Sequence, residues 1–543
     1  MDRFFKELYV SFEVVCDSLF KDYVKVMDNK NNGLGKNQTI ARNSIFMSLR
    51  MVIVLAISLY TTRVVLNTLG IIDYGIYNVV CGFVSMFAFF NVSMSNGIQR
   101  YINYELSKNG IQRAKLVYNA SIRIQVSLAF FLIVISEIIG NWYINNKMVI
   151  PDERFHAALW IFQISIFSFV LVILRVPYTA VVMAHEKLDF YSIISVAEAI
   201  LKLCIALILP FIQIDNLISY CSLLFLVDLF NLVVYIVYTK SNYDEVQIMN
   251  ITDMRLLKSM LGFSGWNLFG TFSHIMKEQG LNLILNLFCG PAVNAARGIA
   301  AQVNAGLQNF VQNITVPVRP QITSSYAVGN MSRVMNLTYT VSKFSCYFLY
   351  ALSLPILLEI DFILNIWLDK SVPMHTASFV LIIILTSFLN NLNAPISNVV
   401  HASGRMKNYQ LYNSLCVLLS VPLSYYVLYL GGTPEAALSV VLFSMVLCQV
   451  VSLIILKTIV NFSYREYLIS VLVPLIRVVL LSIWIPTLFR FLLPNGLIRV
   501  FLVFFSSISF MGITIWFGGI TTDEKIILLS FYDKIKLKWK KQS

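Results

Sequence analysis

Long apolar segments dominate this chain and limit what it can fold into. Stretches of about 20 mostly apolar residues, long enough to cross a bilayer as helices, occur about fourteen times. Only 13% of the 543 residues are charged and 58% are hydrophobic, and the mean hydropathy is +0.73. A water-soluble globule of this length needs more polar surface, so we predict an all-α polytopic membrane protein. The predicted spans lie near residues 44–68, 74–97, 116–140, 156–183, 190–213, 216–238, 259–288, 292–317, 334–358, 375–398, 408–430, 435–458, 467–490 and 496–519.

The sequence also contains an internal repeat. The segment P-Y-T-A-V-V-M-A-H-E-K from Pro177 is similar to P-I-S-N-V-V-H-A-S-G-R from Pro395, 218 positions later. Gly70 and Gly290 each lie shortly after a Leu–Asn pair and are 220 positions apart. Further pairs with a similar spacing are Arg113 and Arg333, Arg123 and Lys343, Pro151 and Pro373, and Trp142 and Trp367. A tandem duplication of this kind is typical of transporters that move one half against the other.

The repeat pairs span one with seven, two with eight and four with ten, so its unit is six spans. Six spans return the chain to its starting side, so we expect two six-helix lobes related by a pseudo-twofold axis along the membrane normal. The last two spans lie outside the duplication. The predicted domains are a cytoplasmic N-terminal segment (1–42), an N-lobe (43–240), an inter-lobe linker (241–258), a C-lobe (259–460), two extra spans (461–520) and a basic tail (521–543). Met1 and Met27 are both candidate start residues.

Basic residues predict the orientation in the membrane. The chain has a formal net charge of +13, and most predicted loops on one side are basic, whereas the opposite loops are acidic. Because basic loops stay in the cytoplasm, we expect both termini there. The acidic, external residues are Asp73, Asp152, Glu153, Asp215, Glu359, Asp361 and Glu435. Arg490 and Arg499 depart from this pattern, near the last external loop.

Polar side chains gather on spans one, two, seven and eight. On span eight, Arg297, Asn304, Gln308 and Gln312 recur at helical spacing. Lipid cannot solvate such a stripe, so we expect these spans to line an aqueous cavity between the lobes. The alternative is that the polar groups form hydrogen bonds between helices.

The candidate cavity holds more cations than anions. Arg50, Arg63, Lys277 and Arg297 stand against Glu278 alone, which favours an anionic ligand headgroup such as a phosphate or diphosphate. Two alternatives stay open. Glu278 could simply neutralise Lys277 or His274, and Arg50 and Arg63 lie near span ends, where their side chains could extend to the interface.

Acids within the spans are candidates for coupling transport to a proton or cation. Asp228 is alone in span six and is the first candidate, with Glu278 as the second; a hydrogen-bonded neutral acid is the alternative for Asp228. Glu198 and Lys202 are four residues apart on span five, so we expect them to pair. The eight cysteines are scattered without a C-x-x-C, so the sequence supports neither a disulfide framework nor a metal site. For a transporter we also expect no catalytic residues and no cofactor.

Several motifs resemble a known family. These are V-V-L-N-T-L-G-I-I-D-Y-G-I-Y-N-V-V from Val64, Q-R-Y from Gln99, V-I-P-D-E-R from Val149, V-P-Y-T-A-V-V-M-A-H-E-K from Val176 and I-L-N-I-W-L-D from Ile363. Together they resemble the Wzx-type polysaccharide flippases of the multidrug/oligosaccharidyl-lipid/polysaccharide exporter superfamily. The resemblance runs from about residue 42 to residue 460. Many of these flippases have twelve spans; the two extra ones here are more like the lipid II flippase branch.

The resemblance implies a flippase of the bacterial inner membrane. It would move undecaprenyl-diphosphate-linked oligosaccharide between leaflets by alternating access, for the biosynthesis of O-antigen lipopolysaccharide or capsule. The partners would be that lipid-linked oligosaccharide, membrane lipids, and the polysaccharide polymerase and glycosyltransferases of the same biosynthesis. We expect no nucleic acid partner, because basic cytoplasmic loops explain the net charge.

Two other functions are alternatives. A cation-coupled multidrug extruder of the same superfamily would require a carboxylate site and an apolar drug cavity. A membrane-embedded glycosyltransferase or polymerase would require a catalytic acid or base in a substantial external loop, and the loops are short. The chain has no phosphate-loop motif, so we expect a transporter that is neither an enzyme nor driven by ATP through this chain itself.

Overall fold

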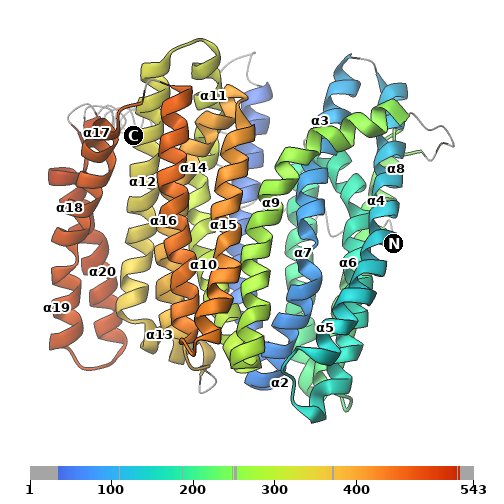
Figure 1. Ribbon diagram of the computed structural model, residues 1–543, viewed down its shortest axis with the longest axis horizontal. Coiled ribbons are helices and arrows are strands. Elements are labelled where there is room, and N and C mark those ends of the chain that lie inside the picture. Colours follow the sequence, from blue (N-terminus) through green and yellow to red (C-terminus); the bar gives the residue numbers. More distant parts are fainter. Residues whose placement is uncertain are drawn as a thin grey trace, which may run out of the picture. The chain divides into compact units, whose positions relative to one another are not determined.

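The computed structural model is built of helices throughout the part of the chain that it describes (Figure 1). It describes the backbone of residues 35–525 except 109, 186, 248, 250–253, 370–371, 461 and 522–523. Side chains are described from residue 50 onward, with the further exceptions of 92, 96, 107, 255, 258–259 and 261–267. The predicted N-terminal segment and most of the predicted basic tail lie outside these residues.

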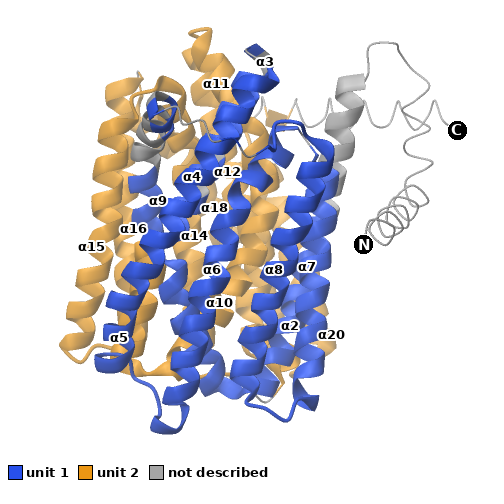
Figure 2. Ribbon diagram, turned by 90° about the vertical axis from the view of Figure 1, so that its right-hand side faces the viewer, with its two compact units in different colours: residues 1–275 blue, residues 276–543 orange. Residues whose placement is uncertain are grey.

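The chain forms two compact units, residues up to Ile275 (unit 1) and residues from Met276 onward (unit 2), so the division falls within helix α9 (Figure 2). The elements up to α9 are α2 (Gly35–Ser85), α3 (Ala88–Lys108), α4 (Ile111–Ile135), η1 (Ser136–Gly140), α5 (Asn141–Asn146), η2 (Asp152–Arg154), α6 (Phe155–Ala184), α7 (Leu188–Ile208), η3 (Leu209–Phe211), α8 (Asn216–Asn242) and α9 (Met254–Cys289). Those that follow are α10 (Pro291–Thr315), η4 (Val316–Val318), α11 (Arg319–Ala327), α12 (Met331–Leu358), α13 (Ile360–Leu368), α14 (Thr376–Ser403), α15 (Met406–Tyr429), α16 (Pro434–Ile459), α17 (Tyr464–Tyr467), η5 (Leu468–Leu472), α18 (Val473–Ser482), α19 (Trp484–Leu492), α20 (Leu497–Thr514) and η6 (Ile515–Gly519).

A helix lies over each of the fourteen predicted spans, and the second span is broken at Met86 and Phe87. Among the described residues, eleven segments are long and apolar enough to cross a membrane, which makes this a multi-pass membrane protein. The number is smaller than fourteen partly because α2 runs through the first span into the second. In addition, α3 and α10 are too polar to qualify, and α9 is only partly described. At the repeat spacing of 220, α10 corresponds to residues 71–95, which form the end of α2 and the beginning of α3.

The two units repeat one packing pattern. In unit 1, α6 packs on α3, α4, α7 and α8. In unit 2, α14 packs in the same way on α10, α12, α15 and α16. The duplication read from the sequence is therefore present in the packing of the helices.

Gly70 and Gly290 have the same backbone conformation. Gly70 interrupts α2 with φ 77° and ψ 173°, and Gly290 separates α9 from α10 with φ 79° and ψ 179°. Side chains other than the hydrogen of glycine are rarely found in this region of φ/ψ space. Two glycines 220 positions apart thus make the same break between consecutive helices, as the repeat predicted.

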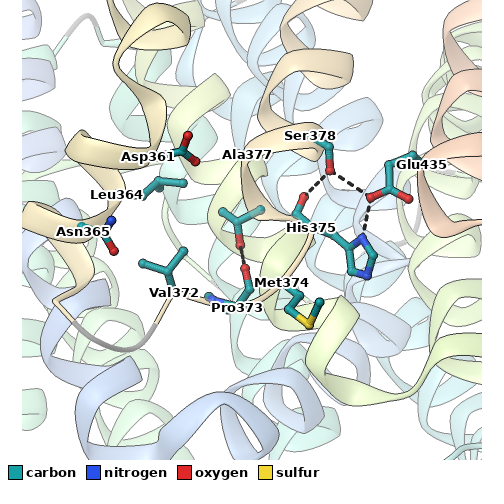
Figure 3. Close-up of a pocket in the computed structure, with 11 residues that line it drawn as sticks. Asp361, Leu364, Asn365, Val372, Pro373, Met374, His375, Ala377, Ser378 and Glu435 are labelled. Carbon is teal, nitrogen blue, oxygen red and sulfur yellow. Dashed lines mark hydrogen bonds and ion pairs between the residues drawn. The ribbon is translucent and has the colours of Figure 1, made fainter. Parts of the chain in front are cut away.

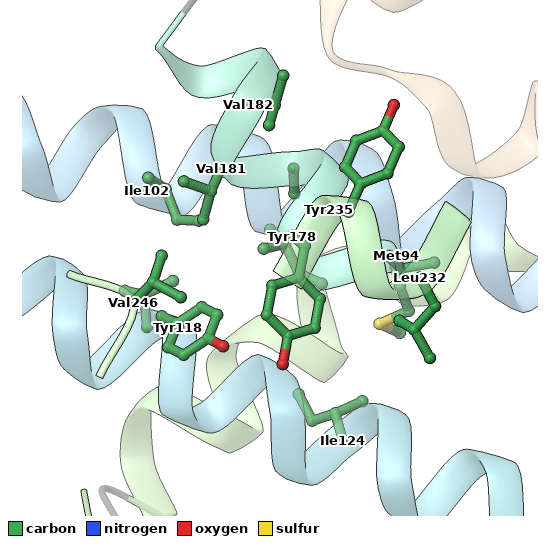
Figure 4. Close-up of a cluster of buried hydrophobic side chains, with 14 of the residues drawn as sticks. Met94, Ile102, Tyr118, Ile124, Tyr178, Val181, Val182, Leu232, Tyr235 and Val246 are labelled. Atoms are coloured by element: carbon green, nitrogen blue, oxygen red, sulfur yellow. The ribbon is translucent and has the colours of Figure 1, made fainter. Parts of the chain in front are cut away.

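Each unit is held together by its own apolar core. In unit 1, Ile102, Tyr118, Tyr178 and Val181 belong to a cluster that also includes Val246 from the segment after α8 (Figure 4). That segment is fixed by hydrogen bonds to Asn119, which donates to the Gln247 carbonyl and accepts from the Met249 amide (both 2.7 Å). The first part of the predicted inter-lobe linker is thus packed against unit 1.

The two predicted extra spans, built from α17 to α20, pack against α12. Tyr347 and Tyr350 of α12 contact Val478 and Met511 in a small core. The Tyr347 hydroxyl also donates to the Gly519 carbonyl (2.9 Å). Two ion pairs reinforce the attachment: Lys343 of α12 with Glu524 (2.6 Å), and Glu359 at the end of α12 with Arg499 of α20 (2.5 Å). The second pair gives an acidic partner to Arg499, which departs from the charge pattern of the predicted loops.

Candidate functional site

One carboxylate joins two buried cations where α9 meets α10. The Glu278 Oε1 atom lies 2.9 Å from the Lys277 ammonium, and its Oε2 accepts a hydrogen bond of 2.9 Å from Arg297 Nη2. The side chains of Lys277 and Arg297 are only 5% and 9% exposed, whereas that of Glu278 is 54% exposed. We call these three residues the anion site, because removing the carboxylate would leave two adjacent cationic groups.

The turn between the two helices positions the anion site. Gly290 reverses the chain, and Pro291 begins α10 with its φ already set for a helix. Below the turn, buried Asn294 donates to both the backbone carbonyl and the side-chain oxygen of Asn282 (each 2.7 Å). These bonds fix the register of α9 against α10, so Glu278 and Arg297 meet although 19 residues separate them.

The rest of the predicted stripe on α10 divides into three environments. Asn304 accepts a hydrogen bond from Ser387 of α14 (2.7 Å), as expected of a polar contact between helices. The Gln308 amide nitrogen is buried without a hydrogen-bond partner among the described residues. Gln312 is exposed. The stripe is thus neither wholly hydrogen-bonded between helices nor wholly exposed.

The other two predicted cationic site residues lie on α2 in unit 1. The Arg50 guanidinium lies over the ring of Tyr191, 5.1 Å from its centroid. Arg63 is half-buried. Of the predicted site residues, the structure brings together Lys277, Glu278 and Arg297; the positions of Arg50 and Arg63 are described only within their own unit.

A second polar site lies inside unit 1, around Asp228 on α8. Ser168 of α6 donates to the Asp228 carboxylate (2.8 Å), and both residues line a cavity of about 230 Å³. Lys202 of α7 lines the same cavity and donates to Glu198 (2.6 Å), which confirms the pair predicted from their spacing. Glu198 also lies 3.8 Å from Arg175 of α6. The cavity is further lined by Tyr77, Cys81, Val84, Ser85, Ile164, Ser165, Phe169, Val172, Tyr220, Cys221 and Leu224.

Sequence reasoning missed the residues that complete this site. Ser165 and Ser168 are three apart on α6 and therefore share a face, and Cys81 contacts Ser165 (3.3 Å). Serines in an apolar span are common, so their spacing alone did not indicate a site. Only the packing of α6 against α8 shows that this face meets Asp228.

An open pocket of about 480 Å³ lies at one end of unit 2 (Figure 3). His375 Nδ1 is paired with the Glu435 carboxylate at 2.5 Å, and the Ser378 hydroxyl donates to the same carboxylate (3.0 Å). Asp361 and Asn365 line the opposite part of the pocket (Figure 3). Asp361 and Glu435 are two of the acids that the sequence analysis assigns to external loops. Among the described residues, no group of three His, Cys, Asp or Glu side chains is arranged to hold a metal ion.

Known structures share this fold at low sequence identity. The lipid II flippase MurJ, in an inward closed conformation, superimposes with a TM-score of 0.62 at 12% identity, covering 88% of this chain and 99% of its own. A multidrug resistance MATE family transporter of the MOP superfamily, in an inward-facing conformation, gives a TM-score of 0.61 at 11% identity, covering 75% and 97%. A MOP superfamily transporter from Pyrococcus furiosus gives a TM-score of 0.57 at 11% identity, covering 77% and 95%.

No family model and no curated protein matches the sequence. At 10–12% identity the structural matches speak for the fold alone. The chain therefore has the all-helical fold shared by transporters of the MOP superfamily.

Proposed function

We propose that this protein is a flippase for lipid-diphosphate-linked oligosaccharide. The observation that carries the proposal is the anion site, in which two nearly buried cations lie beside a single carboxylate. Cations at such a depth in a membrane protein face a partner or a cavity, and a diphosphate offers more charge and more acceptor oxygens than a carboxylate does. The fold, which a lipid II flippase shares, and the family resemblance of the motifs support the same function.

The proposed substrate is undecaprenyl-diphosphate-linked oligosaccharide for polysaccharide such as O-antigen or capsule. In the proposed cycle the two lobes expose the anion site alternately to each side of the bacterial inner membrane. Arg50 and Arg63 of α2, with Asn304, Gln308 and Gln312 of α10, are the proposed further lining of the substrate path, because they continue the polar surface of their helices.

A flipping assay in proteoliposomes tests the proposal. The probe is a fluorescent polyprenyl-diphosphate disaccharide, and its transfer between leaflets is followed with a membrane-impermeant quencher. We expect Lys277→Gln and Arg297→Gln each to slow flipping about tenfold or more, because each removes a charged contact with the headgroup. Arg333→Gln is the matched control, since Arg333 is an exposed cation at the start of α12.

Folding must be separated from function in this assay. Lys277→Gln removes one of the cations that contact Glu278, so its thermal stability in detergent is measured beside its flipping rate. The double variant Lys277→Gln with Glu278→Gln removes one charge of each sign and restores the charge balance. Normal flipping by a stable Arg297→Gln variant contradicts the proposal.

The proposed orientation places both termini in the cytoplasm. Cysteine-labelling tests it in a background from which the native cysteines have been removed. A cysteine at Asp152 should react with an impermeant reagent from outside intact cells, and one at Arg405 should not; both positions are exposed. Reversed labelling contradicts the orientation.

A second candidate function is a cation-coupled multidrug extruder. The observation that favours it is the cavity in unit 1, where the Asp228 carboxylate is held by a neutral hydroxyl donor. In either function Asp228 is the proposed coupling acid. The test is the export of cationic dyes by cells that carry the protein. The extruder is the better account if such cells export the dyes, if Asp228→Asn stops the export, and if Arg297→Gln leaves it intact.

A further inference from the structure

The contacts of Glu278 resemble those of a bound ligand more than those of an ordinary ion pair. Each of its two oxygens contacts a different cation, both at 2.9 Å, as two oxygens of one phosphoryl group would do. Its side chain is half exposed, whereas the two cations are almost completely buried. The carboxylate can therefore leave the cations by rotating about its own side-chain bonds, but the cations have little room to leave.

Charge explains why something must occupy this site. Two cations and one carboxylate leave a formal charge of +1 on the three side chains. Without the carboxylate, two unpaired cations with almost completely buried side chains would be adjacent, which is strongly unfavourable. A transporter that releases an anionic headgroup from these cations must replace it with another anion.

We propose that Glu278 is an exchangeable counter-anion. The inference rests on the proposed function: the diphosphate headgroup displaces Glu278 from Lys277 and Arg297, and the carboxylate turns toward the exposed side. When the headgroup leaves, Glu278 returns and occupies the cations while the empty transporter resets. Glu278 thus weakens headgroup binding and promotes headgroup release.

The glutamine variant separates these two effects. In Glu278→Gln the amide has nearly the same shape but no negative charge, so the headgroup no longer competes with a carboxylate. We expect the equilibrium affinity for the headgroup to rise about tenfold, because one charge-assisted competitor is lost. We also expect multiple-turnover flipping to slow, because the headgroup leaves the bare cations slowly.

Binding is measured by isothermal titration calorimetry on the full chain in nanodiscs, with farnesyl diphosphate as the probe. Glu466→Gln is the control, because Glu466 is an exposed glutamate of α17 that lies outside both polar sites. It should leave the affinity for farnesyl diphosphate at the parent value. An affinity of Glu278→Gln that equals or falls below that of the parent overturns the inference.

A second variant protects the test against misfolding of the first. Glu278→Asp keeps the charge on a shorter side chain that cannot span both cations in the same way. Its affinity should lie between those of the parent and of Glu278→Gln. An affinity no higher than that of the parent overturns the inference as well.

The outcomes also distinguish this inference from the proposed function. If Lys277→Gln and Arg297→Gln do not weaken the binding of farnesyl diphosphate, the headgroup does not bind here, and the proposed function fails. If they weaken binding but Glu278→Gln does not strengthen it, the function stands and the exchange of counter-anions alone is wrong.

Discussion

Unit 1 and unit 2 share a helix arrangement but place their interhelical charges on different helices. In unit 1 the charges lie on α6, α7 and α8, around Asp228 and Glu198. In unit 2 the anion site lies on α9 and α10. At the repeat spacing of 220, Asp228 corresponds to Cys448 and Arg297 to Tyr77, so neither unit has the charges of the other. The two repeats therefore share a helix arrangement, but their interhelical charges lie at different positions.

A second comparison concerns α4 and α12, which the repeat also pairs. In the most apolar window of each helix, 28% of the residues are buried for α4 and 61% for α12. The difference arises because α18 and α20 pack against α12. On the segment of α4 that runs on into α5, large apolar side chains such as Phe130 and Ile138 stay exposed, as suits a lipid-facing surface. The extra helices thus cover in one repeat a surface that the other leaves open.

The largest expected effect tests how the C-terminal segment is attached to α12. Glu524→Gln leaves the Lys343 ammonium, 2% exposed, without its carboxylate, so we expect a loss of about 3–5 kcal/mol in unfolding free energy. Thermal unfolding in detergent measures it. Adding Lys343→Met should restore much of the stability, because the buried charge is then gone. Glu466→Gln, on α17, is the control and should change little.

A smaller effect sharpens the comparison of the repeats. Gly70→Ala and Gly290→Ala each force a side chain into a backbone region that only glycine readily adopts, at a cost of about 1–3 kcal/mol. Because the conformations are equal, the two losses of stability should be similar. Open space surrounds Gly70, so its loss would come from the backbone alone. A tolerated alanine at only one of the two positions would show that the breaks are not equivalent.

The smallest expected effect concerns an ion pair between predicted external loops of unit 1, for which unit 2 has a counterpart. In unit 1, Arg154 bridges Asp73 and Asp215, both at 2.5 Å. In unit 2, Glu435 stands 220 positions after Asp215 and pairs with His375. Partial burial raises the pKa of Asp215, but hydrogen bonds from Arg154 and from the amides of Ile218 and Leu217 outweigh it, so its pKa lies below the usual value.

Since the folded-state pKa of Asp215 is depressed, its contribution to stability is present above its unfolded pKa of about 3.9 and is lost as pH falls further. The contact is partly exposed, so the contribution should not exceed about 1 kcal/mol. Thermal unfolding below about pH 4, compared with Asp215→Asn, measures it. If Asp215→Asn loses as much stability as the parent when the pH falls below about 4, Asp215 does not have this role.

The sequence predicted the helices well because apolar length is a local signal. It also predicted the short-range pair of Glu198 with Lys202, because helix geometry brings residues four apart together. The contact of Lys277 with Glu278 had been one of two alternatives. The bond between Glu278 and Arg297 was not predicted: it depends on how Gly290 turns the chain.

The contacts of the extra helices could not be predicted at all. Arg499 departed from the orientation pattern in the sequence, and its partner Glu359 lies 140 residues away. Lys343 entered only as the repeat partner of Arg123, whose guanidinium instead donates to the Met249 carbonyl. Single-sequence spacing contains no information about such distant partners, whereas the structure shows them directly.

The pair of Lys343 and Glu524 also has a consequence for the synthesis of the protein. The two residues are 181 positions apart, so α12 is made long before its counter-ion exists. At about 5–20 residues per second, the ribosome needs roughly 10–35 s to reach Glu524. During that time the nascent chain must keep Lys343 in water, near headgroups or beside a temporary partner. The final packing of α12 is therefore postponed until Glu524 has been made.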